Sequence, residues 1–243
     1  MRLIACCILF SFVTNSVWAA DCKNPSGKKA YLSNPEFFSP DGTRGQGLRV
    51  KIKGDYVEVP DVRPQCLPIP VRYNNFGALK TRSKGPWEGQ VSRDRFGHAV
   101  FKEVESGISA WGTWIATRTE KPKSAFEIMS IYAPPTDCVG SIGTPPDKCP
   151  YGINPTAQYA ARVARSVGKT AHDKLNLDAT DCREGREALF AVFLEVATFE
   201  IGSNFCGGRC DIDRDLFDRA IDKAIGPVSW GQCADPREAH LKE

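Results

Sequence analysis

The chain has 243 residues, of which 42% are hydrophobic and 25% charged, a balance that is typical of globular proteins. Disorder, collagen-like repeats and long coiled coils are therefore excluded. The formal net charge is only +3, so composition gives no reason to expect a nucleic-acid partner. The unusual feature is the presence of ten cysteines against three histidines, and it bears on the compartment in which the protein works.

The N-terminus has the pattern of a secretory signal peptide. Arg2 is followed by an apolar run over 3–13, and the small residues Ala19 and Ala20 come soon after. The run is too short to span a membrane, so we expect cleavage after Ala19 or Ala20 and no integral membrane segment in the mature chain. An uncleaved anchor or a buried strand is the alternative. We therefore interpret residues 1–19 as a signal peptide and expect a periplasmic or secreted protein.

Removal of the signal peptide leaves 224 of the 243 residues and eight of the ten cysteines. An even number of cysteines in an exported chain indicates disulfides, but sequence alone does not determine how they pair. A metal site is a weaker alternative, because no two cysteines are separated by two residues and no histidine lies near Cys206 and Cys210. We expect no metal and no cofactor.

Residues 20–70 are rich in proline, glycine and lysine and lack a helical period. Within them, alternating residues over 48–59 predict a small β-hairpin. We interpret residues 20–70 as an N-terminal extension held by Cys22 and Cys66, and expect the main domain to cover residues 71–243. Turn pairs and short strand-like pieces continue into the start of that domain.

Helices dominate the rest of the chain. Hydrophobic periodicity and capping signals predict helices over 105–118, 124–132, 154–168, 185–201 and 213–225. Trp111 and Trp114 lie on the apolar stripe of the first of these and are expected in the core. The loop over 136–153 is expected to close through Cys138 and Cys149. The predicted fold class is α+β, mainly α, with a small β-hairpin region and disulfide staples.

Several familiar catalytic motifs are absent. There is no H-E-x-x-H and no G-x-S-x-G, so the zinc proteases and serine hydrolases that carry them have no support. Gly168-Lys169-Thr170 resembles the end of a phosphate loop, but Val163 stands where the leading glycine belongs. His98 lies in an expected hairpin and is interpreted as a surface or turn residue.

The most informative segment is the predicted helix over 185–201, which is apolar nearly all round and should run through the core. Glu200 lies near its C-terminal end, and Gly202 is placed to cap it. Poor solvation and the helix dipole raise the pKa of a carboxyl there, which suits a general acid. The alternative is a structural glutamate that reaches solvent or pairs with Arg209. Glu195 shares this ambiguity but lacks the helix-end position.

A series of short motifs occurs in fixed order between residues 72 and 203. It contains Asn74-Asn75-Phe76-Gly77-Ala78-Leu79-Lys80, Trp87-Glu88-Gly89, Ile131-Tyr132-Ala133-Pro134-Pro135 and Phe199-Glu200-Ile201-Gly202. In this order the motifs resemble a lysozyme-like family of phage virion structural proteins, which opens with NNxGN(I/L)(R/K) and has His-Glu-Asn-Gly at the last position.

The same pieces, in another order, resemble the bacterial glucosaminidases that cleave peptidoglycan. In those enzymes a catalytic glutamate ends a helix and the N-x-F-G-(I/L)-K element follows it. A circular permutation would relate the two orders. The resemblance implies that residues 71–243 form a lysozyme-like helical domain in which Glu200 is the general acid.

The resemblance also implies a cleft that holds a glycan. Asp94 is the candidate second carboxylate, which many glycosidases use as nucleophile or base. The alternative is a structural turn residue, because lytic transglycosylases work with one acid. The candidate substrate-binding residues are Tyr73, Asn74, Asn75 and Trp87, since amides bind sugar hydroxyls and aromatic faces pack on sugar rings. Core packing is the alternative for Trp87.

The sequence therefore predicts an exported glycosidase of the muramidase, glucosaminidase or lytic transglycosylase type that acts on peptidoglycan. Its expected partners are peptidoglycan glycan strands, with an envelope-spanning complex as a further candidate. The alternative is a non-catalytic peptidoglycan-binding or envelope protein on a lysozyme-like scaffold. Two departures from the family favour it: Phe199 and Ile201 replace polar neighbours of the acid, and the N-terminal extension and disulfides have no counterpart there.

Overall fold

The computed structural model describes residues 30–32, 48–52, 55–59, 68–119, 123–138, 145–149, 152–175, 177, 182–203, 206 and 208–227. For the three segments before residue 60, only the backbone is described. The predicted signal peptide and the expected anchoring cysteines Cys22 and Cys66 lie outside these residues.

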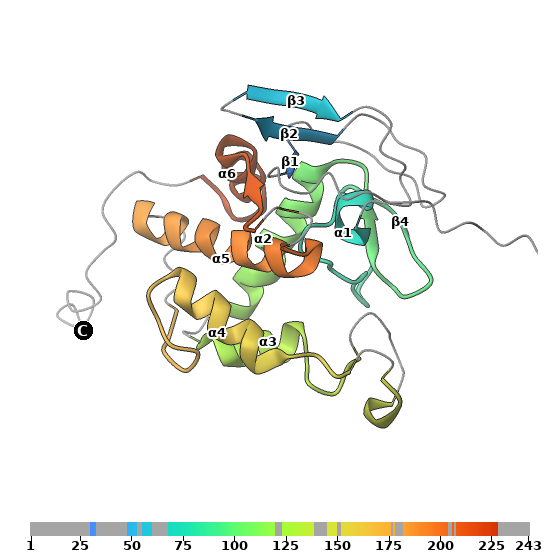
Figure 1. Ribbon diagram of the computed structural model, residues 1–243, viewed down its shortest axis with the longest axis vertical. Helices are drawn as coiled ribbons and strands as arrows, with labels where there is room; N and C mark the ends of the chain where they lie inside the picture. Colours follow the sequence, from blue (N-terminus) through green and yellow to red (C-terminus); the bar gives the residue numbers. More distant parts are fainter. Residues whose placement is uncertain are drawn as a thin grey trace, which may run out of the picture.

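The described part of the chain is a body of helices with two small sheets (Figure 1). The helices are α1 (Ile69–Arg72), α2 (Val104–Thr119), α3 (Ala125–Tyr132), α4 (Thr156–Ser166), α5 (Arg183–Ile201) and α6 (Arg214–Ile225), with a short 3-10 helix over Pro146–Lys148. The strands are β1 (Ala30–Leu32), β2 (Leu48–Ile52), β3 (Asp55–Val59), β4 (Gln90–Arg93), β5 (Ala99–Phe101) and β6 (Asp211–Ile212). The predicted mainly helical class with a small antiparallel sheet is confirmed.

One sheet joins the N-terminal extension to the helical body. Its strand order is β3-β2-β1-β6, with β2 and β3 paired antiparallel as the predicted hairpin. β1 pairs in parallel with β6, which places Tyr31 opposite Asp211. The predicted extension therefore shares a sheet with a strand that follows α5. The second sheet is the antiparallel pair of β4 and β5.

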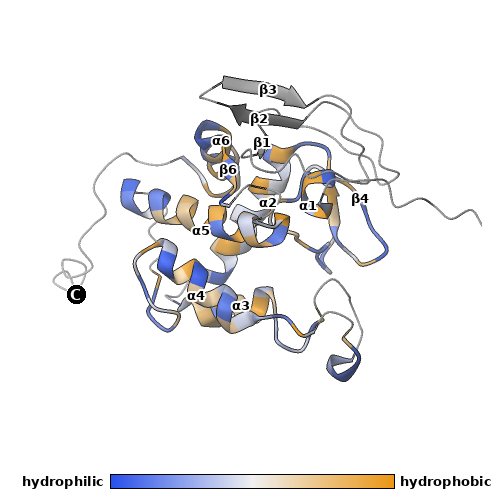
Figure 2. Ribbon diagram, viewed as in Figure 1, coloured by the Kyte–Doolittle hydropathy of each residue, from blue (hydrophilic) through white to orange (hydrophobic). Residues whose placement is uncertain are grey.

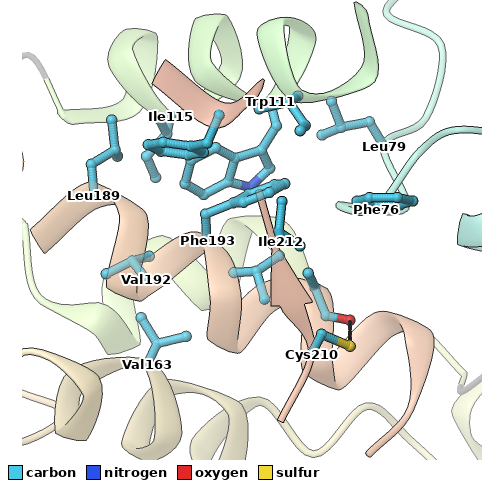
Figure 3. Close-up of a cluster of buried hydrophobic side chains, with 14 of the residues drawn as sticks. Phe76, Leu79, Trp111, Ile115, Val163, Leu189, Val192, Phe193, Cys210 and Ile212 are labelled. Carbon is cyan, nitrogen blue, oxygen red and sulfur yellow. Dashed lines mark hydrogen bonds between the residues drawn. The ribbon is translucent and has the colours of Figure 1, made fainter. Parts of the chain in front are cut away.

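The core is built around α5. This helix begins with hydrophilic residues and becomes largely hydrophobic in its middle (Figure 2). Leu189, Val192 and Phe193 are fully buried, and the Phe193 ring lies 4.7 Å from that of Trp111 on α2 (Figure 3). Burial of these large apolar side chains supplies the main stabilisation of such a domain. The expected core position of Trp111 is confirmed.

Neighbouring helices complete the body. α2 packs on α6, and Gly112 allows their close approach, because a Cβ there would lie 2.7 Å from Cδ1 of Ile221. α4 packs on both α3 and α5. α4 begins at Thr156, one residue after the predicted first helical residue Pro155, and no side chain caps its start. The Asn154 side chain donates to the Pro134 carbonyl oxygen.

Local sequence signals set the ends of two other helices. Ser124 and Glu127 form a reciprocal capping box at the start of α3, which satisfies backbone donors of its first turn. α5 ends at Ile201 and is followed by the capping residue Gly202, whose φ of 98° lies in the region that favours glycine. This confirms the predicted cap and fixes the position of Glu200 one residue before the end of α5.

Disulfides tie down two loops. Cys138 and Cys149 are bonded, with Cα atoms 5.2 Å apart, as predicted. Cys206 and Cys210 are bonded to each other, with Cα atoms 4.7 Å apart, and Cys182 is also disulfide-bonded. The expectation that the cysteines act as staples is confirmed for these pairs. No helix in the described ranges has the length and apolarity needed to cross a membrane.

Candidate functional site

The C-terminal end of α5 opens on a cleft of about 730 Å³. Its walls come from the loop that follows α1, the second half of α2 and the segment that follows α3, and Glu200 contributes from α5. These elements are far apart in the sequence, so the cleft exists only in the folded chain. Its volume is in the range of small-molecule and cofactor sites.

Glu200 lies in the cleft wall against two tyrosines. The Tyr159 hydroxyl donates to Oε1 of Glu200 at 2.9 Å. Tyr159 is buried on α4, and its ring stacks on Phe199 at 3.9 Å. Among the residues that the structure describes, no cation forms an ion pair with Glu200. Burial raises the pKa of Glu200 to about 7, although the Tyr159 hydrogen bond acts in the opposite direction.

Tyr132 is the second tyrosine near Glu200. Its hydroxyl donates to the carbonyl oxygen of Gly77, and its ring meets that of Tyr159 edge-on at 5.9 Å. Burial and the neighbouring Glu200 charge raise the pKa of Tyr132 and Tyr159 well above the ordinary value. Both phenols therefore keep their protons and act as hydrogen-bond donors. Sequence analysis predicted no site role for either tyrosine, although Tyr132 belongs to the motif over 131–135, because their proximity to Glu200 depends on contacts between separate helices.

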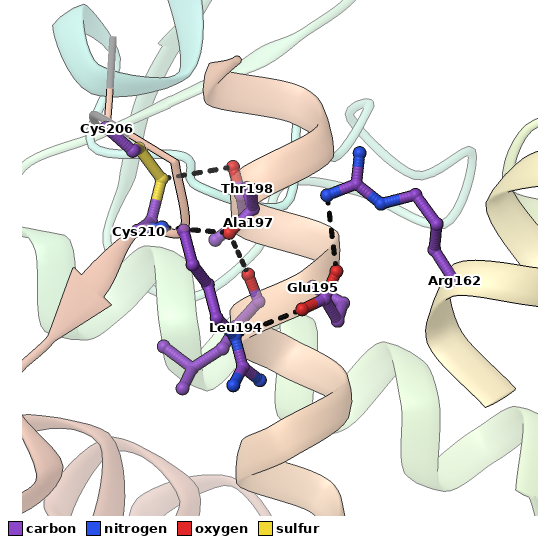
Figure 4. The surroundings of a disulfide bond; sticks show 8 residues. Arg162, Leu194, Glu195, Ala197, Thr198, Cys206 and Cys210 are labelled. Atoms are coloured by element: carbon purple, nitrogen blue, oxygen red, sulfur yellow. Dashed lines mark hydrogen bonds and ion pairs between the residues drawn. A yellow bond between two sulfur atoms is a disulfide. The ribbon is translucent and has the colours of Figure 1, made fainter. Parts of the chain in front are cut away.

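The nearby arginines pair with Glu195 and not with Glu200. Nε of Arg209 lies 3.0 Å from one Glu195 oxygen, and Nη2 of Arg162 lies 3.3 Å from the other (Figure 4). The alternative in which Glu200 pairs with Arg209 is therefore wrong. Since its cationic neighbours are engaged elsewhere, Glu200 faces the cleft without a counter-charge from the described residues.

The Cys206–Cys210 disulfide lies against the last turns of α5. The backbone N–H of Cys210 donates to Oγ1 of Thr198 at 3.0 Å, and its sulfur lies 3.8 Å from the Ala197 carbonyl oxygen (Figure 4). These contacts hold the chain that leaves α5 against the helix. The cysteine pair therefore braces the helix end that carries Glu200.

Asp94 has a structural role in the β4–β5 hairpin. Its Oδ1 accepts the backbone N–H groups of Phe96 and His98, both at 2.8 Å, and its Oδ2 lies 3.0 Å from Nδ1 of His98. The side chain is 7% exposed and does not line the cleft. The turn interpretation therefore replaces the catalytic one. His98, interpreted from sequence as a turn residue, does line the cleft.

Tyr73, Asn74 and Asn75 do not reach the cleft, which corrects their prediction as substrate-binding residues. Both asparagines are 1% exposed, and their amides are used inside the protein. Nδ2 of Asn75 donates to the Leu79 and Ala99 carbonyl oxygens, and that of Asn74 donates to Phe101. Tyr73 is also buried. The physical role of the two asparagines is to satisfy backbone groups of the loop and of β5, which a buried loop requires.

Trp87 does line the cleft, and Trp114 joins it there. Nε1 of Trp87 donates to the Lys80 carbonyl oxygen at 2.9 Å, and this hydrogen bond fixes the ring against its own loop. Trp114 is only partly buried, with its ring 4.9 Å from that of Tyr132. Its predicted core position is confirmed in part: Trp114 packs against the hydrophobic core and also lines the cleft, because the second half of α2 forms a cleft wall.

The described residues hold no group of three or more His, Cys, Asp or Glu side chains that could bind a metal ion. The groups that line the cleft include the Glu200 carboxyl, whose pKa lies near 7, the Tyr132 phenol, the His98 imidazole, the Asp137 carboxylate and several cations. No protein-family model matches the chain, and no curated protein matches it significantly in sequence.

Proposed function

We propose that the protein is an exported glycosidase that cleaves the glycan strands of peptidoglycan, with Glu200 as the general acid. The observation that carries the proposal is a carboxyl with a pKa of about 7 that lines an open cleft and has no cationic partner among the described residues. A general acid works best when its pKa lies near the working pH. The motif order that ends in Phe199-Glu200-Ile201-Gly202 provides the substrate class.

In this mechanism Glu200 donates its proton to the glycosidic oxygen as the bond from that oxygen to the anomeric carbon breaks. The leaving sugar departs as an alcohol, and positive charge develops on the other sugar. The resulting Glu200 carboxylate keeps the hydrogen bond from Tyr159, which stabilises it. Glu200 then regains a proton from the nucleophile that attacks the anomeric carbon.

A single acid fits the composition of the cleft. Asp94 is outside it, and the other carboxylate that lines it, Asp137, lies 3.5 Å from Nζ of Lys80. The pattern of one acid without a second carboxylate at its side favours the lytic transglycosylase type, in which a hydroxyl of the substrate is the nucleophile. Attack by water gives a product heavier by one water molecule, so mass spectrometry of the released fragments distinguishes the two.

The disulfides support the proposed location. Disulfide bonds persist in oxidising compartments such as the periplasm and the extracellular space. The signal-peptide pattern over residues 1–19 gives the same location. Peptidoglycan is accessible from that compartment.

The test compares Glu200→Gln with Asp137→Asn in an assay of fragment release from purified peptidoglycan. Glu200→Gln keeps the size of the side chain and removes the acid, so we expect release to fall by roughly 100- to 10,000-fold. Asp137→Asn removes a carboxylate from the same cleft and should change release by less than about fivefold. Equal release by Glu200→Gln and the parent would refute the assignment.

A non-catalytic peptidoglycan-binding protein is the alternative, favoured by the apolar residues Phe199 and Ile201 on either side of the acid. In the structure Phe199 supports Tyr159 by stacking, so its apolar character has a positional purpose. A parent protein that sediments with purified sacculi and releases no fragments at any pH would select the alternative.

A further inference from the structure

We propose that the cleft recognises a carboxylate on its glycan, through Arg82 and Arg118 on its rim. This inference rests on the proposed function and deepens it, because it names the chemical feature of the substrate that is bound. It starts from the charges that line the cleft: four basic side chains, Lys80, Arg82, Lys84 and Arg118, and two acidic ones.

Arg82 is held in place by its own loop. Its Nε donates to the Gly85 carbonyl oxygen at 3.2 Å and its Nη2 to that of Pro86 at 3.1 Å. The guanidinium lies over the Trp87 ring, 4.7 Å from its centre. An exposed arginine ordered in this way loses less entropy when it binds a ligand.

Arg118 presents a similar arrangement from α2. Its guanidinium lies over the Trp114 ring at 5.6 Å, and its Nη1 donates to Oγ1 of Thr117 at 3.1 Å. No carboxylate of the described residues pairs with Arg118 or with Arg82. Two guanidinium groups from separate elements are thus available for an anion from outside the protein.

The remaining charges in the cleft do not cancel them. Lys80 pairs with Asp137, and the raised pKa of Glu200 leaves much of that side chain uncharged at neutral pH. Arg82, Arg118 and the exposed Lys84 therefore give the rim a net positive charge. A cleft lined by one sign of charge concentrates ligands of the opposite sign.

The two guanidinium groups also reduce the ring surface of Trp87 and Trp114 that is available for stacking on a sugar. One face of each ring is covered by an arginine, and Trp87 is only 9% exposed. Stacking of sugar rings on Trp87 is therefore limited, and the guanidinium N–H groups are the donors that a ligand meets there. Guanidinium groups bind carboxylates with paired, charge-assisted hydrogen bonds.

In peptidoglycan, carboxylates come from two sources: the stem peptides and, once the peptides are removed, the lactyl groups of the sugars. The experiment uses both. Binding is measured by sedimentation with the Glu200→Gln protein, which prevents cleavage, on intact peptidoglycan, on glycan strands freed of peptide, and on each after conversion of its carboxyls to amides.

We expect Glu200→Gln to bind the native material at least fivefold more tightly than the amidated material, and to lose that preference in 0.5 M salt, roughly the range in which screening shortens to a few ångströms. Adding Arg82→Gln and Arg118→Gln should lower binding at least fivefold. Arg165→Gln, on the exposed side of α4, is the matched control and should bind normally.

If the native form binds more tightly than the amidated form only for intact peptidoglycan, the bound carboxylates belong to the stem peptides. If the same preference is seen for strands freed of peptide, they belong to the sugars. Equal binding of native and amidated glycan by Glu200→Gln, or no binding to either, would overturn the inference. The salt dependence does not rely on the arginine variants and so tests the proposal even if they fold poorly. Cleavage that survives Glu200→Gln refutes the proposed acid and leaves the binding comparison intact.

Discussion

Glu195 and Glu200 are two carboxylates on one helix that the protein treats in opposite ways. Glu195 is bracketed by Arg162 of α4 and Arg209 of the loop after α5. Glu200 has a tyrosine hydroxyl as its partner and burial raises its pKa to about 7. The side-chain type and the helix are the same, so the difference comes from where each residue lies on the helix and from the groups that the rest of the chain places beside it.

Helix geometry explains how this separation arises. Five residues correspond to a rotation of about 140° around the helix axis, so the two side chains leave α5 in different directions. Glu195 points toward Arg162 of α4 (Figure 4) and also pairs with Arg209. Glu200 reaches the cleft at the helix end, where the neighbouring groups are aromatic. A desolvated acid without a counter-charge is suited to proton donation, and a paired one is suited to structure.

The largest expected effect is on the pH dependence of cleavage. If protonated Glu200 is the reactive form, the rate should fall roughly tenfold for each pH unit above about 7, and so about 100-fold by pH 9. Fragment release from peptidoglycan between pH 5 and pH 9 measures this. Sedimentation of Glu200→Gln over the same range is the control for binding. A rate that stays constant to pH 9 would contradict the role of Glu200.

The second effect concerns stability. The folded pKa of Glu200 is raised, so its contribution to stability is fully present below the unfolded value near 4.5 and is lost as pH rises to about 7. Above pH 7 the buried charge costs up to about 3 kcal/mol. Glu200→Gln removes this cost, so its free energy of unfolding should exceed that of the parent at pH 8 and approach it near pH 4.5.

The free energy of unfolding is measured by denaturation in urea, and Glu195→Gln is the matched comparison for Glu200→Gln. It removes two partly exposed ion pairs and should lower the free energy of unfolding by about 1–2 kcal/mol. The two variants therefore shift stability in opposite directions at pH 8. A Glu200→Gln protein that is less stable than the parent at pH 8 would show that its carboxylate is stabilising.

The smallest effect tests the hydrogen bond to Glu200. Tyr159→Phe keeps the stacking on Phe199 and removes the hydroxyl that lowers the Glu200 pKa. The alkaline limb of the rate profile should move up by as much as about one pH unit. Tyr132→Phe, which loses a bond to the Gly77 carbonyl oxygen, leaves the Tyr159–Glu200 bond in place and is the control. A shift to lower pH would contradict this account.

Much of the fold followed from local patterns. The five long helices were predicted within about two residues at each end, because periodicity, capping residues and glycines act over a few neighbours. The Cys138–Cys149 bond was expected from a short proline- and glycine-rich loop. Glu200 was singled out because a carboxyl at the end of an apolar helix is unusual, and its prediction as a general acid came from the family resemblance.

The candidate binding residues were predicted less well. Asn74 and Asn75 are polar in the sequence yet buried, because their amides satisfy backbone groups of β5 and of their own loop. His98 was dismissed, although the hairpin carries it into the cleft wall. Such assignments depend on contacts between segments tens of residues apart, which periodicity does not report.

The sequence by itself determined the helices, the disulfide-forming character of the chain and the presence of an acid at a helix end, since each depends on residues close together along the chain. Only the tertiary structure decided which glutamate is paired and which faces the cleft. Arg162, Arg209 and Tyr159 come from other elements, and the pKa of a carboxyl depends on the groups within a few ångströms of it in space.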